Sequence, residues 1–148
     1  MSERYTSCVD LHLLLTDAQG RIALGKRTNT GWMDDHYHLP AGHLESGEAA
    51  TAGAVRELAE ETGAQAAPDE LRLVHVMHHY TSDGRTALFF EIVRPKWDLA
   101  NTEPDKCAGW EFFTADALPE KIVPYAKTAL GHIAKGVLYS EQGWENAR

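Results

Sequence analysis

Three glutamates that lie close together, Glu57, Glu60 and Glu61, are the residues of this chain best suited to chemistry. Residues 49–61 are rich in Ala, Glu, Leu and Arg, which favour a helix. In a helix the three glutamates share one face because they are three and four residues apart. Carboxylates this close repel one another, and a divalent cation such as Mg²⁺ or Mn²⁺ relieves the repulsion. The alternative is a solvated acidic face with Arg56 as a local ion-pair partner.

The expected helix also has residues suited to its two ends. Ser46 is a candidate N-cap, and Glu48 lies in the expected first turn, where the helix dipole favours an anion. Gly63 suits the left-handed conformation that closes a helix. The side opposite the carboxylates carries small or apolar residues that can pack on a sheet, namely Thr51, Ala54, Val55, Leu58 and Thr62.

These features belong to one longer pattern. From Gly42 to Ala64 the chain reads GHLESGEAATAGAVRELAEETGA, which fits G-x5-E-x7-R-E-U-x-E-E-x-G-U with U aliphatic and the small Ala64 in the last position. This pattern is the Nudix box, and the segment resembles the catalytic helix of a Nudix hydrolase. The resemblance is strongest over residues 24–64 and weaker over residues 103–119. It implies an α/β fold, an α/β/α sandwich with a mixed central sheet, as one domain over residues 1–148.

The resemblance assigns roles within the box. It implies that Glu57, Glu60 and Glu61 are metal ligands. The backbone carbonyl of Ala41 is expected to be a further ligand. Many relatives have Gly at position 41, and Ala restricts that backbone but leaves its carbonyl in place. We choose Glu57 as the residue that activates or orients the nucleophilic water.

Two further acidic or basic contacts are implied by the same resemblance. Arg56 is expected to hold the glutamates of the box through ion pairs, including one with Glu48. Glu103 precedes a Trp-containing strand in EPDKCAGWEFF, as an acidic residue does in Nudix enzymes of the MutT type, and is expected to be an extra metal ligand or base. Asp105 and Glu91 are rivals for that role, and a solvated loop carboxylate is the alternative reading of Glu103.

Candidate substrate contacts lie just before the box. By the resemblance, Arg27 contacts the substrate phosphates, and Lys26 can share that task. Aromatic rings in the loop over residues 28–38 can stack on a nucleobase, at roughly 1–3 kcal/mol per base, or they can pack beneath the loop. The predicted substrate contacts are therefore Arg27, Trp32, Tyr37, His38 and Gly42.

The histidines could suggest a zinc site, but their spacing argues against it. In the strand-like segment HVMHHY, alternation places His75 and His79 on one face and His78 on the other, which divides the cluster. A substrate-facing His75 or His79 is left open. Three histidines near the box can line the site, namely His36, His38 and His43.

The remaining elements must position these residues. Five segments have strand-like patterns, at residues 7–15, 21–26, 71–80, 86–93 and 109–114. A loop is expected over residues 28–38 and an irregular acidic loop over 97–107. An amphipathic helix is predicted over residues 125–139, so both element types alternate around a mixed sheet.

Composition limits the class of function. The chain has 148 residues and a net charge of −8, which argues against general nucleic-acid binding, since that needs a basic patch. Affinity for polyphosphates must therefore come mainly from bound cations. The sequence shows no membrane span and no secretory signal, so a cytoplasmic location is expected. Cys8 and Cys107 are expected to be buried reduced thiols rather than a disulfide.

The leading functional hypothesis is a Mg²⁺-dependent Nudix hydrolase, with Mn²⁺ able to substitute, that cleaves a pyrophosphate bond in a small-molecule nucleotide. A MutT-like enzyme would convert an NTP or dNTP to NMP and pyrophosphate. Alternative substrates are ADP-ribose and nucleotide sugars, dinucleoside polyphosphates, or capped RNA ends. A nucleotide-binding Nudix module without turnover is the alternative of another class. A homodimer is possible, because homodimers are common among similar proteins.

Overall fold

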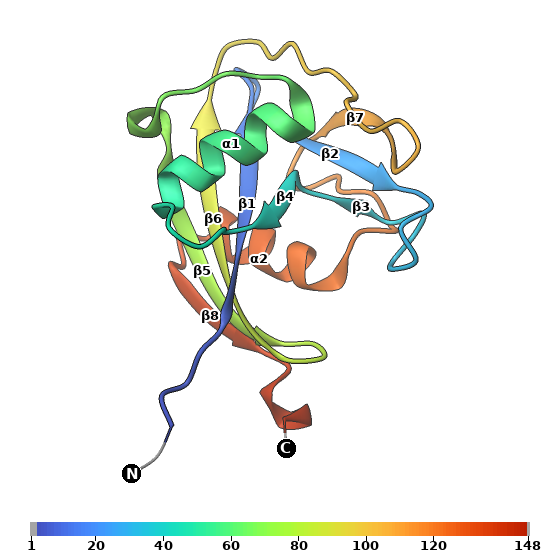
Figure 1. Cartoon of the computed structure of the whole chain (residues 1–148). Coiled ribbons are helices and arrows are strands. Elements are labelled where there is room, and N and C mark those ends of the chain that lie inside the picture. The colour runs from blue at the N-terminus through green and yellow to red at the C-terminus, as the bar shows by residue number, and fades with distance from the viewer. Residues whose placement is uncertain (1–2, 148) are drawn as a thin grey trace.

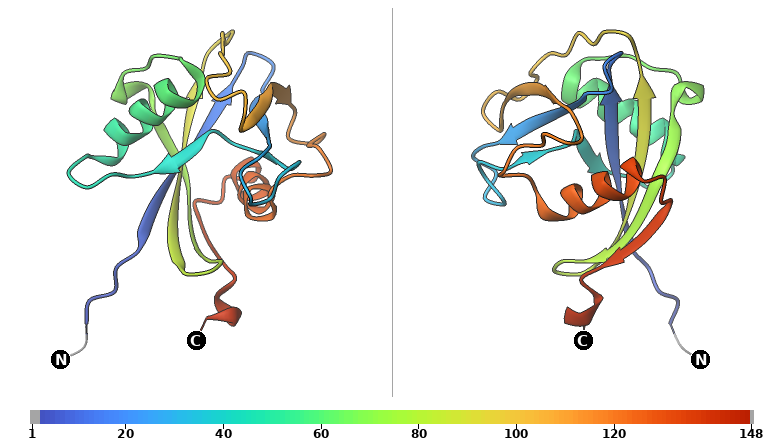
Figure 2. Two further views of the ribbon diagram at one scale, coloured as in Figure 1. Left: turned by 45° about the vertical axis from the view of Figure 1, so that its right-hand side comes forward. Right: turned by 180° about the vertical axis from the view of Figure 1, so that it is seen from behind.

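The computed structural model describes residues 3–147 and contains a mixed β-sheet with one α-helix on each side. Helix α1 (Ala50–Thr62) and helix α2 (Pro124–Ala134) lie on opposite faces of the sheet (Figure 1, Figure 2). The expected α/β/α sandwich is thus confirmed. The strands are β1 (Cys8–Thr16), β2 (Ile22–Arg27), β3 (Tyr37–His38), β4 (Ala41–His43), β5 (Arg72–Tyr80), β6 (Gly84–Val93), β7 (Cys107–Phe113) and β8 (Tyr139–Gln142).

The sheet has its strands in the order β3-β2-β1-β6-β5-β8, with β4 paired to β1 and β7 paired to β2. Strand β1 runs parallel to β6 along its whole length, whereas β5 and β6 are antiparallel. Strands β1 and β2 pair only at Thr16 and Ile22. Farther along β1, its edge is taken by β4, with Leu11 opposite Gly42. The sheet therefore divides beside β1, and β4 brings the start of the box against the central strand.

Strand β1 is buried on both faces because a helix covers each side of the sheet. Its residues Leu11, Leu13 and Leu15 pack in the core beneath α1, together with Leu58 of that helix. Leu14 points to the other core. That second core also contains two small or apolar residues of α2, Ala129 and Leu130. Burying each leucine contributes roughly 1.5–3 kcal/mol.

Helix α1 is confirmed, but its predicted N-terminus is wrong. The helix begins at Ala50, and Ala49 takes the N-cap position without a side-chain hydrogen bond. Ser46 lies too early to cap it. Glu48 also precedes the first turn, since the helix begins only at Ala50. Its carboxylate instead accepts a hydrogen bond from the backbone N–H of Glu45 and pairs with Arg56 of the helix. Gly63 ends the helix in the left-handed conformation, at φ 75°, as predicted.

The predicted helix over residues 125–139 is too long. Helix α2 ends at Ala134, and Gly136 turns the chain at φ 73° into β8. The backbone N–H of Val76 in β5 donates to the carbonyl of Leu138, so the last residues of the predicted helix pair with a strand instead. Pairing with the sheet edge outweighs the helical pattern of these residues.

Two other expectations concern the membrane and the cysteines. Within residues 3–147 no helix is long and apolar enough to cross a membrane. Cys8 and Cys107 are both free, in agreement with the expected absence of a disulfide. The expectation that both thiols are buried is wrong, because Cys107 is only partly buried and Cys8 is exposed at the start of β1, before that strand enters the core.

Candidate active site

The acidic face of α1 presents its three carboxylates at three depths. Glu57 is buried, with 7% of its surface exposed, Glu61 is partly buried, and Glu60 is exposed. Burial raises the pKa of Glu57. Burial, followed by the nearby carboxylates of Glu103, Glu57 and Glu60, raises the pKa of Glu61 to about 7. This face therefore carries more negative charge than its surroundings neutralise.

Arg56 is the positive centre of this face. Its guanidinium donates to both carboxylate oxygens of Glu48, at 2.7 and 3.1 Å. It also donates to Glu57 at 2.9 Å and to Glu60 at 3.1 Å. A further hydrogen bond, at 3.1 Å, reaches the backbone carbonyl of His43. One side chain thus links the loop before α1 to the first two glutamates of the acidic face.

Gly42 and Glu57 fit together closely. Strand β4 places Gly42 directly over the Glu57 carboxylate, and a Cβ atom on residue 42 would overlap that carboxylate. The absence of a side chain at Gly42 therefore leaves the space in which Glu57 lies.

The loop that carries Glu103 is attached to the end of α1. The hydroxyl of Thr102 donates to the backbone carbonyls of Glu60 at 2.6 Å and Glu61 at 3.0 Å. The backbone N–H of Ala100 donates to the carbonyl of Thr62 at 2.8 Å. These bonds use carbonyls that the helix terminus leaves unpaired, and they hold Glu103 beside the acidic face.

The donor set of this face suits a hard divalent cation. Its oxygens come from carboxylates, and burial together with the neighbouring carboxylates raises the pKa of Glu61. Within the described residues, no three His, Cys, Asp or Glu side chains already converge on one point. Two of the three glutamates instead turn to Arg56.

A cavity of about 990 Å³ lies next to this face. Its wall includes Ala41, Gly42 and Glu61 at one end. Most of the other predicted contacts also line it, namely Arg27, Lys26, Trp32, His38, His43, His79 and Glu103. The structure therefore places most predicted substrate contacts around one space, which Glu61 reaches from the acidic face. Glu57, beneath Gly42, and Glu60, exposed to solvent, are not on the cavity wall.

Several predicted residues lie elsewhere. The side chain of Tyr37 is on the opposite face of β3 from His38, and its hydroxyl donates to Glu111. Glu91 accepts a hydrogen bond from Thr16 and pairs with Arg72, away from the cavity. Three other candidates, Asp105, His36 and His75, are also absent from the cavity wall. Of the three acidic residues considered outside the box, only Glu103 lines the cavity.

The loop before β3 holds Arg27 in a defined position. The guanidinium of Arg27 donates to the carbonyl of Trp32 and to the hydroxyl of Thr30, both at 2.9 Å. It also lies 4.9 Å from the centroid of the Trp32 ring. Trp32 is 45% exposed. Arg27 and Trp32 therefore form one unit at the edge of the cavity.

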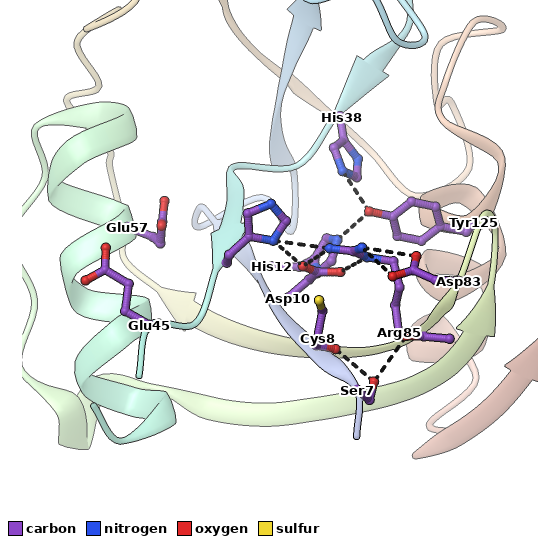
Figure 3. A network of polar contacts seen from close by, with 12 residues as sticks. Ser7, Cys8, Asp10, His12, His38, Glu45, Glu57, Asp83, Arg85 and Tyr125 are labelled. Atoms are coloured by element: carbon purple, nitrogen blue, oxygen red, sulfur yellow. Dashed lines mark hydrogen bonds and ion pairs between the residues drawn. The ribbon is translucent and has the colours of Figure 1, made fainter. Parts of the chain in front are cut away.

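Sequence reasoning missed the polar residues at the other end of the cavity (Figure 3). Asp10 of β1 accepts hydrogen bonds from Arg85 at 2.7 and 2.9 Å and contacts His43 at 2.7 Å. Burial acts to raise the pKa of Asp10, but the bonds from Arg85 and His43 outweigh it and leave the pKa below its usual value. A signal was present, because Asp10 and His12 are two apart in VDLHLLL and so share one strand face.

Beside that ion pair, β1, β3, β5 and α2 bring together three histidines and a tyrosine. The Tyr125 hydroxyl lies 2.7 Å from Nε2 of His12 and 3.1 Å from Nε2 of His38. The ring of His79 stacks on Tyr125 at 4.6 Å between centroids. We refer to His12, His38, His79 and Tyr125 as the histidine cluster.

The NUDIX domain family matches residues 8–132. An RNA pyrophosphohydrolase of Novosphingobium aromaticivorans is 27% identical over 145 residues, which cover 83% of this chain and 86% of that protein.

Solved structures show the same fold. A MutT NUDIX hydrolase from Burkholderia pseudomallei aligns with a TM-score of 0.75 at 22% identity, covering 86% of this chain and 98% of that one. A MutT protein from Methanosarcina mazei Go1 aligns with a TM-score of 0.76 at 15% identity, covering 99% and 100%.

Proposed function

Because the chain belongs to the NUDIX domain family and is a pyrophosphohydrolase, we propose that it converts a nucleoside triphosphate to the monophosphate and pyrophosphate. The observation that carries this proposal is the acidic face of α1, in which Glu57 is buried beneath Gly42 and Glu61 lines a cavity of about 990 Å³. A cavity of this size accommodates a nucleotide.

The acidic face is proposed to hold Mg²⁺, or Mn²⁺ in its place. Glu57, Glu60 and Glu61 would supply carboxylate oxygens. The Ala41 carbonyl and Glu103 would supply further ones. When bound, such an ion polarises phosphate oxygens and lowers the pKa of water. A cation here would also offset the repulsion among the carboxylates, which adds to burial in raising the pKa of Glu61.

The other residues of the chain would position the substrate and the acidic groups. Arg56 holds Glu48, Glu57 and Glu60 in place through its ion pairs. Arg27 lines the cavity, and its positive charge can contact a phosphate oxygen. Glu57, buried and with a raised pKa, is suited to accept a proton from the attacking water.

A substrate panel tests this function. The protein would be incubated with Mg²⁺ and separately with NTPs, dNTPs, ADP-ribose, nucleotide sugars and dinucleoside polyphosphates, and the products would be identified. We expect NMP and pyrophosphate from an NTP or dNTP, and no product in the presence of a chelator. Turnover in chelator, or turnover of nucleotide sugars alone, would reject the proposal.

Two variants connect the activity to α1. Glu57→Gln is expected to lower kcat about a hundredfold or more, since it removes a charge that acts on the reacting groups. Glu45→Gln is the matched control, because Glu45 is exposed and lies 3.6 Å from Arg56. The Glu45 variant should retain near-normal rates, and a normal rate for Glu57→Gln would refute the assignment of Glu57.

A second candidate is pyrophosphohydrolysis of RNA, because the 27%-identical relative is named an RNA pyrophosphohydrolase. The net charge of −8 disfavours contacts with a long RNA backbone. A short RNA with a 5′-triphosphate therefore belongs in the panel. A kcat/KM for this RNA above that for every free NTP would favour the second candidate.

A further inference from the structure

Four ring nitrogens in the histidine cluster have no hydrogen-bond partner within the described residues. They are Nδ1 of His12, Nδ1 of His38, and both ring nitrogens of His79. These three side chains are 0%, 6% and 2% exposed, and all line the cavity. A buried polar atom without a partner costs about 1–3 kcal/mol. The cavity thus has an end whose polar atoms can be satisfied by a ligand.

That end of the cavity suits an uncharged group. Burial lowers the pKa of His12 to about 4 and also lowers the pKa of His38 and of His79, so all three rings are neutral at pH 7. The charged residues that act on these rings include Asp10 and Arg85, which form an ion pair with each other, and Arg27, whose guanidinium is bound to Trp32 and Thr30. A phosphate would gain little there, whereas a neutral ring with N–H groups and acceptors would satisfy the open nitrogens.

The Tyr125 hydroxyl couples two of the histidines. It has one proton and lies within hydrogen-bond distance of two Nε2 atoms. If it donates to one ring, the other ring must donate its own Nε2–H to the hydroxyl oxygen. His12 and His38 are then opposite tautomers, so one open Nδ1 is a donor and the other an acceptor.

We refer to the hydrogen bonds that link His12, the Tyr125 hydroxyl and His38 as the relay. In either direction of the relay, the two histidines present one Nδ1 donor and one Nδ1 acceptor to the cavity.

The other members of the cluster supply a donor and flat surfaces. A neutral His79 carries one N–H and one lone pair, both without a partner, and its stacking on Tyr125 fixes the plane of the ring. Trp32, 6.5 Å from His38 between ring centroids, borders the same space. A planar ligand can therefore meet hydrogen-bonding groups along its edge and an aromatic face above it.

We propose that the histidine cluster is a recognition site for the neutral base of a nucleotide, in which the open ring nitrogens of His38 and His79 pair with donors and acceptors of the base and His12 and Tyr125 set the tautomer of His38. This inference rests on the proposed nucleotide substrate. His38 and His79 would contact the base, whereas His12 and Tyr125 would be positioning residues.

Binding without turnover tests the base site. Isothermal titration with AMP, GMP, CMP, UMP and ribose 5-phosphate in chelator would compare ligands that share a phosphate but differ in the base. We expect at least one nucleotide to bind about tenfold or more tighter than ribose 5-phosphate. In Tyr125→Phe and in His79→Phe this preference should fall severalfold. Equal affinity of wild-type protein for all five ligands would overturn the proposal.

The relay has its own readout in the ring-nitrogen NMR signals of ¹⁵N-histidine-labelled protein. We expect His12 and His38 to be opposite tautomers, one protonated at Nδ1 and the other at Nε2. Tyr125→Phe keeps the ring that stacks on His79 but removes the hydroxyl, so at least one of the two tautomers should change. Tyr139→Phe, in which an exposed hydroxyl bound to Glu141 is removed, is the matched control. Unchanged tautomers in Tyr125→Phe would overturn the relay.

Failure of this inference is distinguishable from failure of the proposed function. Both measurements are made in chelator and need no catalysis. Hydrolysis of NTPs together with base-independent binding would reject the base site alone. A clear preference for a base with no hydrolysis of any NTP would reject the proposed activity and leave the recognition site supported.

Discussion

At the scale of single residues, the site depends on having a glycine at position 42, directly over the Glu57 carboxylate. Glu57 is buried and charged, an arrangement that proteins tolerate only when the charge has partners. Arg56 is one partner, and the open space at Gly42 leaves room for the carboxylate. Position 42 therefore decides where the Glu57 carboxylate lies.

We predict that Gly42→Ala lowers kcat about tenfold or more and the free energy of unfolding by about 1–3 kcal/mol, because the added Cβ displaces the Glu57 carboxylate. Enzyme assays and urea denaturation would measure the two effects. Gly131→Ala is the control, since a Cβ there meets no atom within 4 Å. Wild-type activity in Gly42→Ala would show that the displaced carboxylate takes no part in turnover.

Glu103 can be tested against its neighbour in the same loop. Glu103→Gln should reduce kcat more than about tenfold, since Glu103 lines the cavity beside Glu61. Asp105→Asn should leave kcat near normal, because Asp105 is not on the cavity wall. Equal rates for the two variants would return Glu103 to the status of a solvated loop carboxylate.

The sequence predicts some site residues better than others, for physical reasons. The glutamates of α1 are close in sequence, so helix geometry alone places them on one face. Tyr37 and His38 are adjacent, and only the direction of β3 decides that His38 faces the cavity. Tyr125 meets His12 across 113 residues of chain, a contact that only the packing of α2 on the sheet produces.

At the scale of elements, strands with a clear pattern of apolar residues could be predicted from the sequence. Strands that form only by pairing with a neighbouring strand could not be predicted. Strand β1 has a nearly continuous apolar run, which is visible in sequence. Strand β4 has three residues and exists because it pairs with Asp10, Leu11 and His12. Strand β8 likewise forms against β5. Short strands of this kind have no periodicity by which they could be predicted.

Replacing glycine by alanine should have opposite effects on stability at the end of α1 and inside α2. Gly63→Ala is expected to lower the free energy of unfolding by about 1 kcal/mol, because residue 63 has a φ of 75° that a Cβ disfavours. Gly131→Ala should raise it by up to about 1 kcal/mol, because Gly131 lies inside α2 with open space around its Cβ position. Urea denaturation measures both, and a loss of stability in Gly131→Ala would contradict this account.

At the scale of the whole molecule, buried ionisable groups make stability depend on pH. The pKa of His12 is about 4 in the folded chain, against 6.5 for an ordinary histidine. As the pH falls below 6.5 the unfolded chain takes up a proton that the folded chain refuses until about pH 4. The contribution of His12 to the unfolding free energy should thus fall by roughly 3 kcal/mol across this window and stay level below it.

Glu61 acts in the opposite direction, since its pKa is raised, so the pH effect of His12 must be measured as a difference. The relevant quantity is the difference between the unfolding free energies of the wild-type protein and the His12→Gln variant. Because both proteins contain Glu61, its contribution cancels in this difference. We expect this difference to decrease as the pH is lowered from 6.5 to 4, as followed by urea denaturation at each pH. A difference that does not vary with pH would show that His12 titrates normally.

The two faces of β1 serve different purposes, and this separation affects how the ligand preference of such a protein can change by mutation. Leu11, Leu13 and Leu15 support the helix that carries the acidic residues, whereas Asp10 and His12 point into the opposite end of the cavity. Because one layer of backbone separates the two sets, mutation at His12, and at His38 and His79, can change ligand preference without altering the residues beneath α1. A library randomised at those three histidines is therefore a direct route to variants with new specificity on an unchanged catalytic scaffold.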